Sequence, residues 1–92
     1  MGKVDAFKVS GCECYFRSED HDPPHFHVKH KQEGWDIRVF IHTTDEKTLS
    51  YDFKIPSGRN KPIDGALERE IRKLVFEHRE ALMIEHSTKV KS

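Results

Sequence analysis

The sequence predicts a single domain with an α+β fold: an antiparallel meander of four to five strands, with one C-terminal amphipathic helix packed on one face. Three observations support this fold. The chain has 92 residues, which suits one hydrophobic core. Apolar and polar residues alternate through the first 55 residues, as in strands with one buried face. After Pro56 the apolar residues take the spacing of a helix, which can cover the apolar face of the sheet.

Five short segments have the pattern of strands, and turn residues separate them. Ser10-Gly11 is typical of a tight turn between two strands. The Pro23-Pro24 pair separates the second strand from the third, because proline cannot donate a hydrogen bond to a ladder. In the second segment Cys12, Cys14 and Phe16 alternate with polar neighbours. The predicted strands are residues 4–9, 12–17, 25–30, 36–43 and 49–55.

The last part of the chain predicts one long helix over residues 64–86, with Asp64 as its N-cap. The apolar residues of this segment recur at helical spacing and form one stripe. They are Leu67, Ile71, Leu74, Val75, Leu82 and Met83. Residues 87–92 are polar and are expected to fray.

Composition narrows the function classes. Lys and Arg number 16, and so do Asp and Glu, so the formal net charge is zero, whereas a general binder of nucleic acid should be clearly basic. No apolar run reaches the ~20 residues of a membrane span, and the N-terminus lacks the pattern of a signal peptide. We therefore expect a cytoplasmic protein that does not contact a membrane. In a reducing compartment Cys12 and Cys14 should be free thiols in the core, because the alternative, half of a thiolate metal site, lacks a second cysteine pair.

The alternation of side chains along the strands predicts that most of the histidine, arginine and tyrosine side chains of the sheet lie on the face away from the helix. Phe26 and Val28 alternate with His25 and His27, so the two histidines share the polar side of their strand. By the same parity, the apolar side also takes Ile37, Val39, Ile41, Tyr51, Phe53 and Ile55. The polar side takes Glu13, Tyr15, Arg17, His25, His27, Arg38, Phe40, His42, Asp52 and Lys54.

The polar side allows three interpretations. The first is a binding surface, since Tyr and Arg are enriched at interface centres; its residues would be Tyr15, Arg17, His25, His27, Arg38, Phe40 and His42. The second is acid–base cleavage of a phosphodiester, with the candidates Tyr15, His25, His27 and Arg38. The third is a metal site on His25 and His27, with His42 or Asp52 as a third ligand. Because His-x-His alone is a weak signal and arginine repels a cation, we assign neither a catalytic nor a metal set, and we expect no cofactor.

The other chemically suggestive residues favour structural roles. His21 falls in a loop, and His30 has the wrong parity for the face that holds His25. His78 lies between apolar positions of the helix and is expected to pack there. Arg59 precedes the helix and could help to hold an anion at its N-terminus, but the full phosphate-loop pattern is absent, so an ordinary basic connector is favoured.

Residues 17–28 contain a Pro-Pro-His-x-His-Val motif that follows a strand ending in an aromatic residue and a polar loop. In this motif the chain resembles the small bacterial proteins grouped as domain of unknown function 4160, and its C-terminal amphipathic helix is similar to theirs. The matching residues are Gly11, Tyr15, Phe16, Ser18, Pro23, Pro24, His25, His27 and Val28. The hairpin over residues 35–55 is longer than in the usual member. The resemblance implies a regulatory or toxin–antitoxin-like role beside another small protein encoded next to it, and it implies no established molecular activity.

The function predicted from the sequence is therefore that of a small binding or regulatory module rather than an enzyme. Its partner would be another protein or a second copy of the chain, bound through the polar side of the sheet. A nucleic acid is the alternative partner, through a local basic patch of Arg17, Arg38, Lys54 and Arg59. A nuclease-like enzyme that needs no metal, and a histidine-based metal-binding protein, are the two further alternatives.

Overall fold

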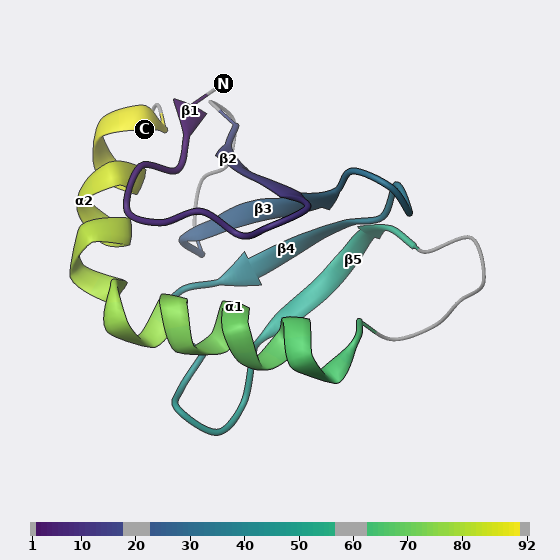
Figure 1. Cartoon of the computed structure of the whole chain (residues 1–92). Coiled ribbons are helices and arrows are strands. Elements are labelled where there is room, and N and C mark those ends of the chain that lie inside the picture. The colour runs from purple at the N-terminus through teal and green to yellow at the C-terminus, as the bar shows by residue number, and fades with distance from the viewer. Residues whose placement is uncertain (1, 18–22, 57–62, 91–92) are drawn as a thin grey trace.

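The computed structural model describes residues 2–17, 23–56 and 63–90, which form five strands and two helices (Figure 1). The strands are β1 (Gly2–Lys3), β2 (Cys12–Phe16), β3 (His25–His30), β4 (Asp36–Phe40) and β5 (Tyr51–Ile55). The helices are α1 (Gly65–Glu77) and α2 (Arg79–Lys89). The strands lie in the order β1-β2-β3-β4-β5, and every neighbouring pair is antiparallel. This confirms the predicted α+β meander, whereas the C-terminal half differs in having two helices.

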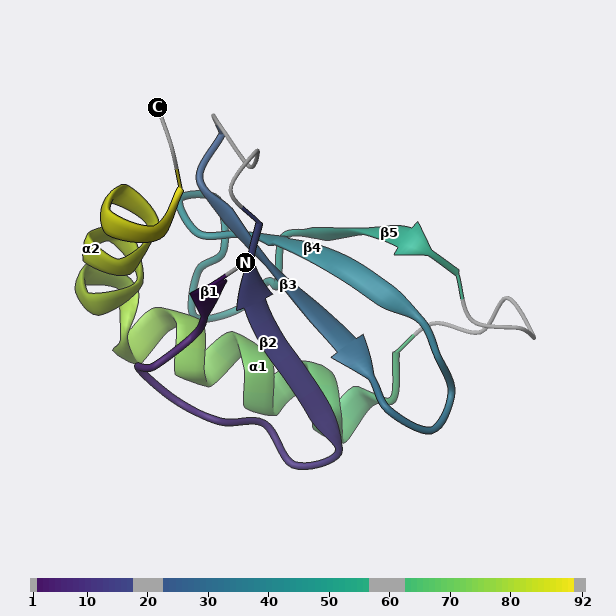
Figure 2. The ribbon, with the colours of Figure 1, turned by 90° about the horizontal axis from the view of Figure 1, so that it is seen from above.

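The hydrophobic core lies between the sheet and the two helices. Figure 2, seen from above, shows α1 running beneath the sheet. Phe26 and Val39, directly opposite each other on β3 and β4, are fully buried, and so are Ile71 of α1 and Leu82 of α2. Burying a side chain of this size contributes roughly 1.5–3 kcal/mol. The apolar side of the strands, found from parity alone, is therefore the side that the helices cover.

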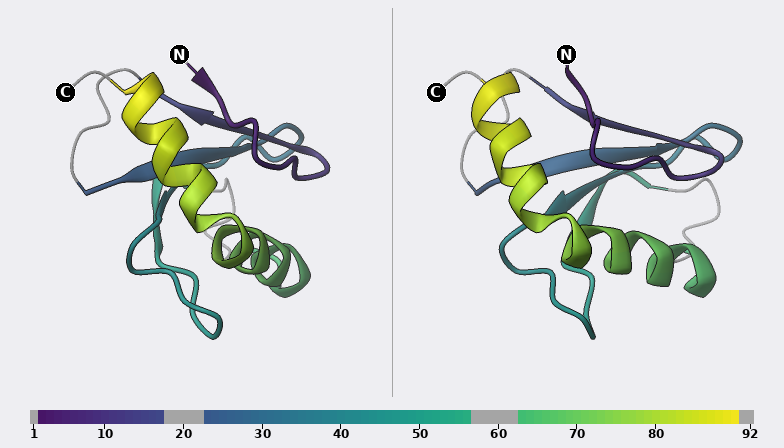
Figure 3. Two further views of the ribbon diagram at one scale, coloured as in Figure 1. Left: turned by 90° about the vertical axis from the view of Figure 1, so that its left-hand side faces the viewer. Right: turned by 60° about the vertical axis from the view of Figure 1, so that its left-hand side comes forward.

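The prediction of one continuous helix over residues 64–86 is wrong, because the chain bends at His78. The backbone there has φ −111° and ψ 21°, outside helical geometry, and α1 and α2 point in different directions (Figure 3). The His78 ring packs 5.7 Å from the Phe7 ring, and Arg79 donates a hydrogen bond to the Thr44 carbonyl. Both contacts come from distant parts of the chain, so the helical spacing alone could not reveal the bend.

The predicted start of the helical region is confirmed, but its predicted end is not. The Asp64 carboxylate accepts hydrogen bonds from the backbone N–H groups of Ala66 and Leu67, at 3.1 and 3.3 Å, which confirms the predicted N-cap. Fraying of residues 87–90 is contradicted, since α2 continues to Lys89 and Val90 is buried, while residues 91 and 92 of the predicted tail lie outside the described residues. Contacts between α2 and the N-terminal segment hold this last turn in place.

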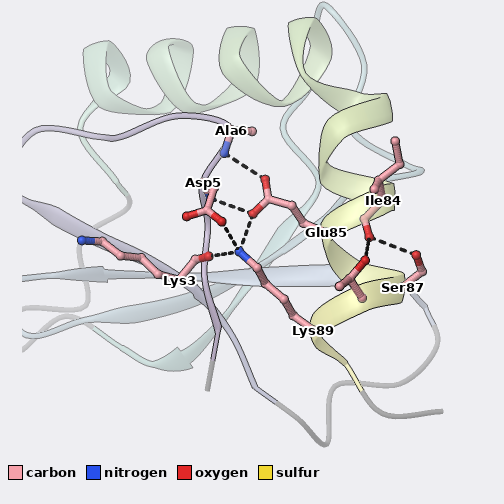
Figure 4. Close-up of polar contacts among 8 residues, drawn as sticks. Lys3, Asp5, Ala6, Ile84, Glu85, Ser87 and Lys89 are labelled. Carbon is pink, nitrogen blue, oxygen red and sulfur yellow. Dashed lines mark hydrogen bonds and ion pairs between the residues drawn. The ribbon is translucent and has the colours of Figure 1, made fainter.

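The predicted strand over residues 4–9 is wrong, although its apolar residues are buried. Only Gly2 and Lys3 pair with β2, and after one further hydrogen bond, from Val4 N–H to the Cys14 carbonyl at 3.0 Å, the segment leaves the sheet. The Glu85 carboxylate accepts the N–H groups of Asp5 and Ala6, at 2.6 and 2.9 Å, so these groups are not available to a ladder (Figure 4). The alternation in this segment reflects burial against the core and not a strand.

Lys89 completes this set of contacts between the N-terminal segment and α2. Its ammonium donates to the Lys3 carbonyl, to the Asp5 carboxylate at 2.7 Å and to the Glu85 carboxylate at 2.8 Å (Figure 4). We call Asp5, Glu85 and Lys89 the terminal clamp. It joins the two ends of the chain, since Asp5 and Lys89 are 84 positions apart.

Strands β4 and β5 are shorter than the predicted strands over residues 36–43 and 49–55, because a buried threonine organises their connection. The Thr44 hydroxyl donates to the Phe40 carbonyl at 2.8 Å and accepts from the Ser50 N–H at 3.0 Å, which turns the chain after Phe40. The N–H of Ile41 donates instead to the Pro24 carbonyl at 3.0 Å. Leu49 stays buried in the core although it lies outside β5.

A register shift between β4 and β5 moves Ile55 off the core side. Ile37 lies opposite Phe53, but the residue before it in β4, Asp36, lies opposite Ile55 rather than Lys54. Ile55 thus shares a side with Asp36, away from the core, and is 47% exposed. The prediction that Ile55 faces the helix is wrong for this reason.

Candidate functional site

Four side chains cross the sheet in one row on the face away from the core. Tyr15 of β2 lies opposite His27 of β3, His27 lies opposite Arg38 of β4, and Arg38 lies opposite Asp52 of β5. Directly opposed residues project to the same side of a sheet, so these four share one face. Beside the row, His25 lies opposite Phe40, and Lys29 lies opposite both Glu13 and Asp36. We call this surface the open face; it comprises Glu13, Tyr15, His25, His27, Lys29, Asp36, Arg38, Phe40 and Asp52.

The open face confirms the predicted grouping of His25, His27 and Arg38 away from the core, with Phe26 buried on the other side. His42 does not belong to it. Because β4 ends at Phe40, His42 lies in the turn that follows and is exposed to solvent. His42 is therefore removed from the predicted binding set and from the metal candidates.

A buried polar cluster forms the centre of the open face. His27 is 1% exposed and Asp36 is 3% exposed, even though neither faces the hydrophobic core. The Tyr15 ring stacks on the His27 ring, with 4.9 Å between centroids and 15° between planes. The Tyr15 hydroxyl donates a hydrogen bond to one Asp36 oxygen, and the other Asp36 oxygen lies 3.4 Å from Nδ1 of His27. The hydrogen bond from Tyr15 to Asp36 and the stacking of Tyr15 on His27 therefore connect the three side chains and restrain their positions.

Asp36 is the residue of this cluster that the sequence analysis missed. It has the parity of Arg38 and Phe40, so strand alternation could have placed it on the open face. Its burial and its bond to Tyr15 depend on the pairing of β2 with β3 and of β3 with β4, which joins residues 21 positions apart. No local pattern contains that information.

The Pro-Pro-His-x-His segment builds the start of β3 and ties it to β4. Nδ1 of His25 lies 2.8 Å from the Pro23 carbonyl, and since a carbonyl only accepts, Nδ1 carries the hydrogen in this contact. The Pro24 carbonyl accepts from the N–H of Ile41 just after β4. The His25 ring packs edge-on to His27, with centroids 5.3 Å apart, and is itself largely buried. Both histidines of the motif therefore serve as packed parts of the open face.

Arg38 and Asp52 form a two-pronged ion pair at the outer end of the row. Nε and Nη2 of Arg38 each donate to one oxygen of Asp52, both at 2.8 Å. This is the fork geometry in which arginine binds a carboxylate. Both side chains are about half exposed, so the pair lies on the surface. Two of the donors that a phosphate would use are thus directed at Asp52.

The remaining candidates lie elsewhere. His30 has the predicted opposite parity and lies against Trp35, and His78 packs on Phe7 as predicted. Arg17 lies just beyond β2 and is partly buried, while Lys54 is exposed on β5. His21 and Arg59 fall outside the described residues, and so does the Ser18 of the motif.

The structure brings together no set of three metal ligands of the His, Cys, Asp or Glu type within residues 2–17, 23–56 and 63–90. Cys12 and Cys14 are free and buried, as predicted. Burial, followed by the neighbouring thiol of Cys12, raises the pKa of Cys14 to about 12. Burial, followed by the charge of Glu70, also raises the pKa of Cys12. Both groups are therefore protonated thiols at neutral pH, which does not favour a thiolate metal site.

No helix among the described residues is long and apolar enough to cross a membrane. No protein-family model, no curated protein and no solved structure matches this chain. The resemblance to domain of unknown function 4160 therefore stays a prediction from the motif.

Proposed function

We propose that this chain is a protein-binding module that acts through the open face. The observation that carries the proposal is the arrangement of charge. Arg38 lies opposite Asp52, and Lys29 lies between Glu13 and Asp36. A face on which each of these cations opposes a carboxylate offers little to a phosphate backbone, but it can match a partner surface of alternating charge.

Burial within the face supports the same function. Tyr15, Phe40 and Arg38 of the open face are only partly buried, and these residue types are enriched at the centres of protein interfaces. The contacts of Tyr15 with the buried His27 and Asp36 hold this surface in one arrangement. A rigid surface loses less conformational entropy when it binds.

The acid–base alternative has weaker support. A general base must come within hydrogen-bond distance of the proton that it removes. His27 is fully buried and His25 nearly so, while the fork of Arg38 is directed at Asp52. A nuclease would need these groups to turn outward before they could contact a substrate.

The experiment is site-specific photocross-linking in cells. The cross-linker p-benzoylphenylalanine replaces exposed Lys29 on the open face, and in a matched control it replaces Lys73 of α1, whose side chain is 75% exposed. We expect an adduct of one discrete mass from position 29 and none from position 73. An adduct of twice the chain mass would identify a second copy as the partner, and another mass a different protein, such as one encoded nearby as the family resemblance implies. Equal labelling at both positions would contradict the proposal.

A second arm of the test uses RNA. Fluorescence anisotropy of a labelled single-stranded RNA, measured at several salt concentrations, should show no specific binding. Strong binding with a steep salt dependence, together with RNA cleavage lost in His25→Ala, would replace the proposal by the nuclease-like alternative.

A further inference from the structure

The outer edge of β5 is the longer of the two edges of the sheet, and the proposed function, which uses the open face, does not occupy it. β5 stands last in the strand order and has five residues, whereas β1 at the other end has two. Within residues 2–17, 23–56 and 63–90 no strand pairs with the outer edge of β5. Figure 2 shows β5 at the border of the sheet that lies away from the N-terminal segment. Such an edge presents backbone groups to which another strand can bind.

The pairing of β5 with β4 shows which of its backbone groups point outward. The Ser50 carbonyl accepts a hydrogen bond from the N–H of Phe40 at 2.9 Å, and Asp52 continues this ladder two residues further on. Backbone groups of an antiparallel strand point alternately to one neighbour and to the other, so those of Asp52 also face β4. The N–H and C=O groups of the next residue, Phe53, therefore point away from β4.

The residue order of β5 is complementary to itself in the antiparallel direction. When two copies of β5 pair about Phe53, this residue lies opposite its counterpart, and Asp52 of each copy lies opposite Lys54 of the other. The outward backbone groups of the two Phe53 residues can then exchange two hydrogen bonds. Directly opposed residues share a face, so the two pairs of opposite charge lie together on one side of the joined sheet.

Two features of β5 discourage pairing with an arbitrary strand. Lys54 is exposed, and the register shift against β4 lies beside it. An edge lysine and a bulge both protect a sheet from unspecific pairing. A second β5 satisfies the charge by supplying Asp52 opposite Lys54, whereas a pairing centred on either of these residues would oppose like charges. The backbone bonds at Phe53 precede the shift and do not depend on it.

We propose that two copies of this chain associate through β5, antiparallel about Phe53, into one continuous sheet. Asp52 already accepts two hydrogen bonds from Arg38, at 2.8 Å, but its side chain is about half exposed and can also face Lys54 of the second copy. The row across the open face thus continues into the second chain. Because the formal net charge is zero, the two copies do not repel each other overall. The association does not depend on what the open face binds.

The test measures the mass of the purified chain by sedimentation equilibrium over a range of concentrations. The mass should rise with concentration towards that of two chains. Lys54→Glu turns both pairs of opposite charge into pairs of like charge and should weaken the association roughly tenfold or more. Lys73→Glu makes the same change on α1, where the side chain is 75% exposed, and should leave the association unchanged.

A mixture of two variants tests the register itself. Asp52→Lys produces the opposite fault, since lysines then face lysines, and should also weaken the association. Mixing this variant with Lys54→Glu restores both pairs of opposite charge, so the mixture should dimerise at concentrations at which neither variant does so alone. A dimer formed through another surface would not show this rescue.

Hydrogen exchange in the unmodified chain needs no variant. Exchange of the Phe53 amide should slow as the concentration rises, while that of the Asp52 amide, which faces β4, should stay constant. A monomer at every concentration, a dimer that Lys54→Glu leaves intact, or a Phe53 amide that exchanges equally fast in the dimer would overturn the proposal. The photocross-linked adduct from position 29 tests the open face and does not depend on this outcome, because that position lies on β3, two strands away from β5.

Discussion

Two polar clusters connect distant parts of this chain, and they differ in burial. Tyr15, His27 and Asp36 form a cluster whose histidine and carboxylate are almost completely buried beneath the open face. The terminal clamp lies at the surface: its Asp5 side chain is 76% exposed, and its Lys89 side chain is 22% exposed. Water screens the exposed ion pairs, whereas a buried polar group depends entirely on its protein partners. The comparison teaches that one cluster fixes the arrangement of the open face, while the other fastens the ends of the chain.

Removing the buried carboxylate should have the largest effect on stability. Asp36→Ala removes the acceptor of the Tyr15 hydroxyl and the carboxylate that faces Nδ1 of His27, at a cost of about 2–3 kcal/mol in the free energy of unfolding. Asp52→Ala is the control, because it removes a surface carboxylate whose pair should be worth less than about 1 kcal/mol. Urea unfolding of both variants at neutral pH measures the difference. Equal losses in the two variants would mean that the burial of Asp36 does not increase its contribution to stability.

The next largest effect should come from the terminal clamp. Glu85→Ala removes the acceptor of two backbone N–H groups, those of Asp5 and Ala6, and should lower the free energy of unfolding by about 1–2 kcal/mol. Hydrogen exchange should accelerate at these two amides and stay unchanged at the amides of β3 and β4. Exchange that accelerates throughout the sheet would show that the clamp supports the whole core.

The smallest effect should be the alkaline titration of Lys89. Burial opposes ionisation, but the hydrogen bonds to Asp5 and Glu85 outweigh it and raise the pKa of Lys89. The folded chain therefore holds this proton more tightly than the unfolded chain, in which the pKa of a lysine is about 10.4. The stabilisation is fully present below that pH and is lost as the pH rises through the folded pKa. The difference in unfolding free energy between the native chain and Lys89→Met should shrink above about pH 10.4, and a constant difference would contradict this account.

Much of the open face could be predicted from the sequence, because strand parity is a local rule. The alternation around His27 placed it with Tyr15 and Arg38, and the β2–β3–β4 register confirms that grouping. The errors have one common cause, which is that tertiary contacts decide where an element ends. The Thr44 side chain ends β4 before His42, and the register shift beside Asp36 turns Ile55 outward.

The helical half shows the same limit. Ile71, Val75 and Leu82 keep helical spacing across the bend at His78, and all three are buried. The periodicity reports which residues are buried and carries no information on the direction of the axis. The N-terminal segment is a parallel case, since Val4 and Val9 are buried without belonging to a strand.

The most direct test of the central claim compares two variants, one from each cluster. Tyr15→Phe keeps the ring that stacks on His27 and removes the hydroxyl that binds Asp36, while Glu85→Ala weakens only the terminal clamp. Both should lower stability by a similar amount, about 1–2 kcal/mol. The measurement is the yield of the photocross-linked adduct from position 29 in each variant. We predict that Tyr15→Phe lowers the yield severalfold and that Glu85→Ala leaves it unchanged. An equal yield in both variants would contradict the claim that the buried cluster shapes the open face for its partner.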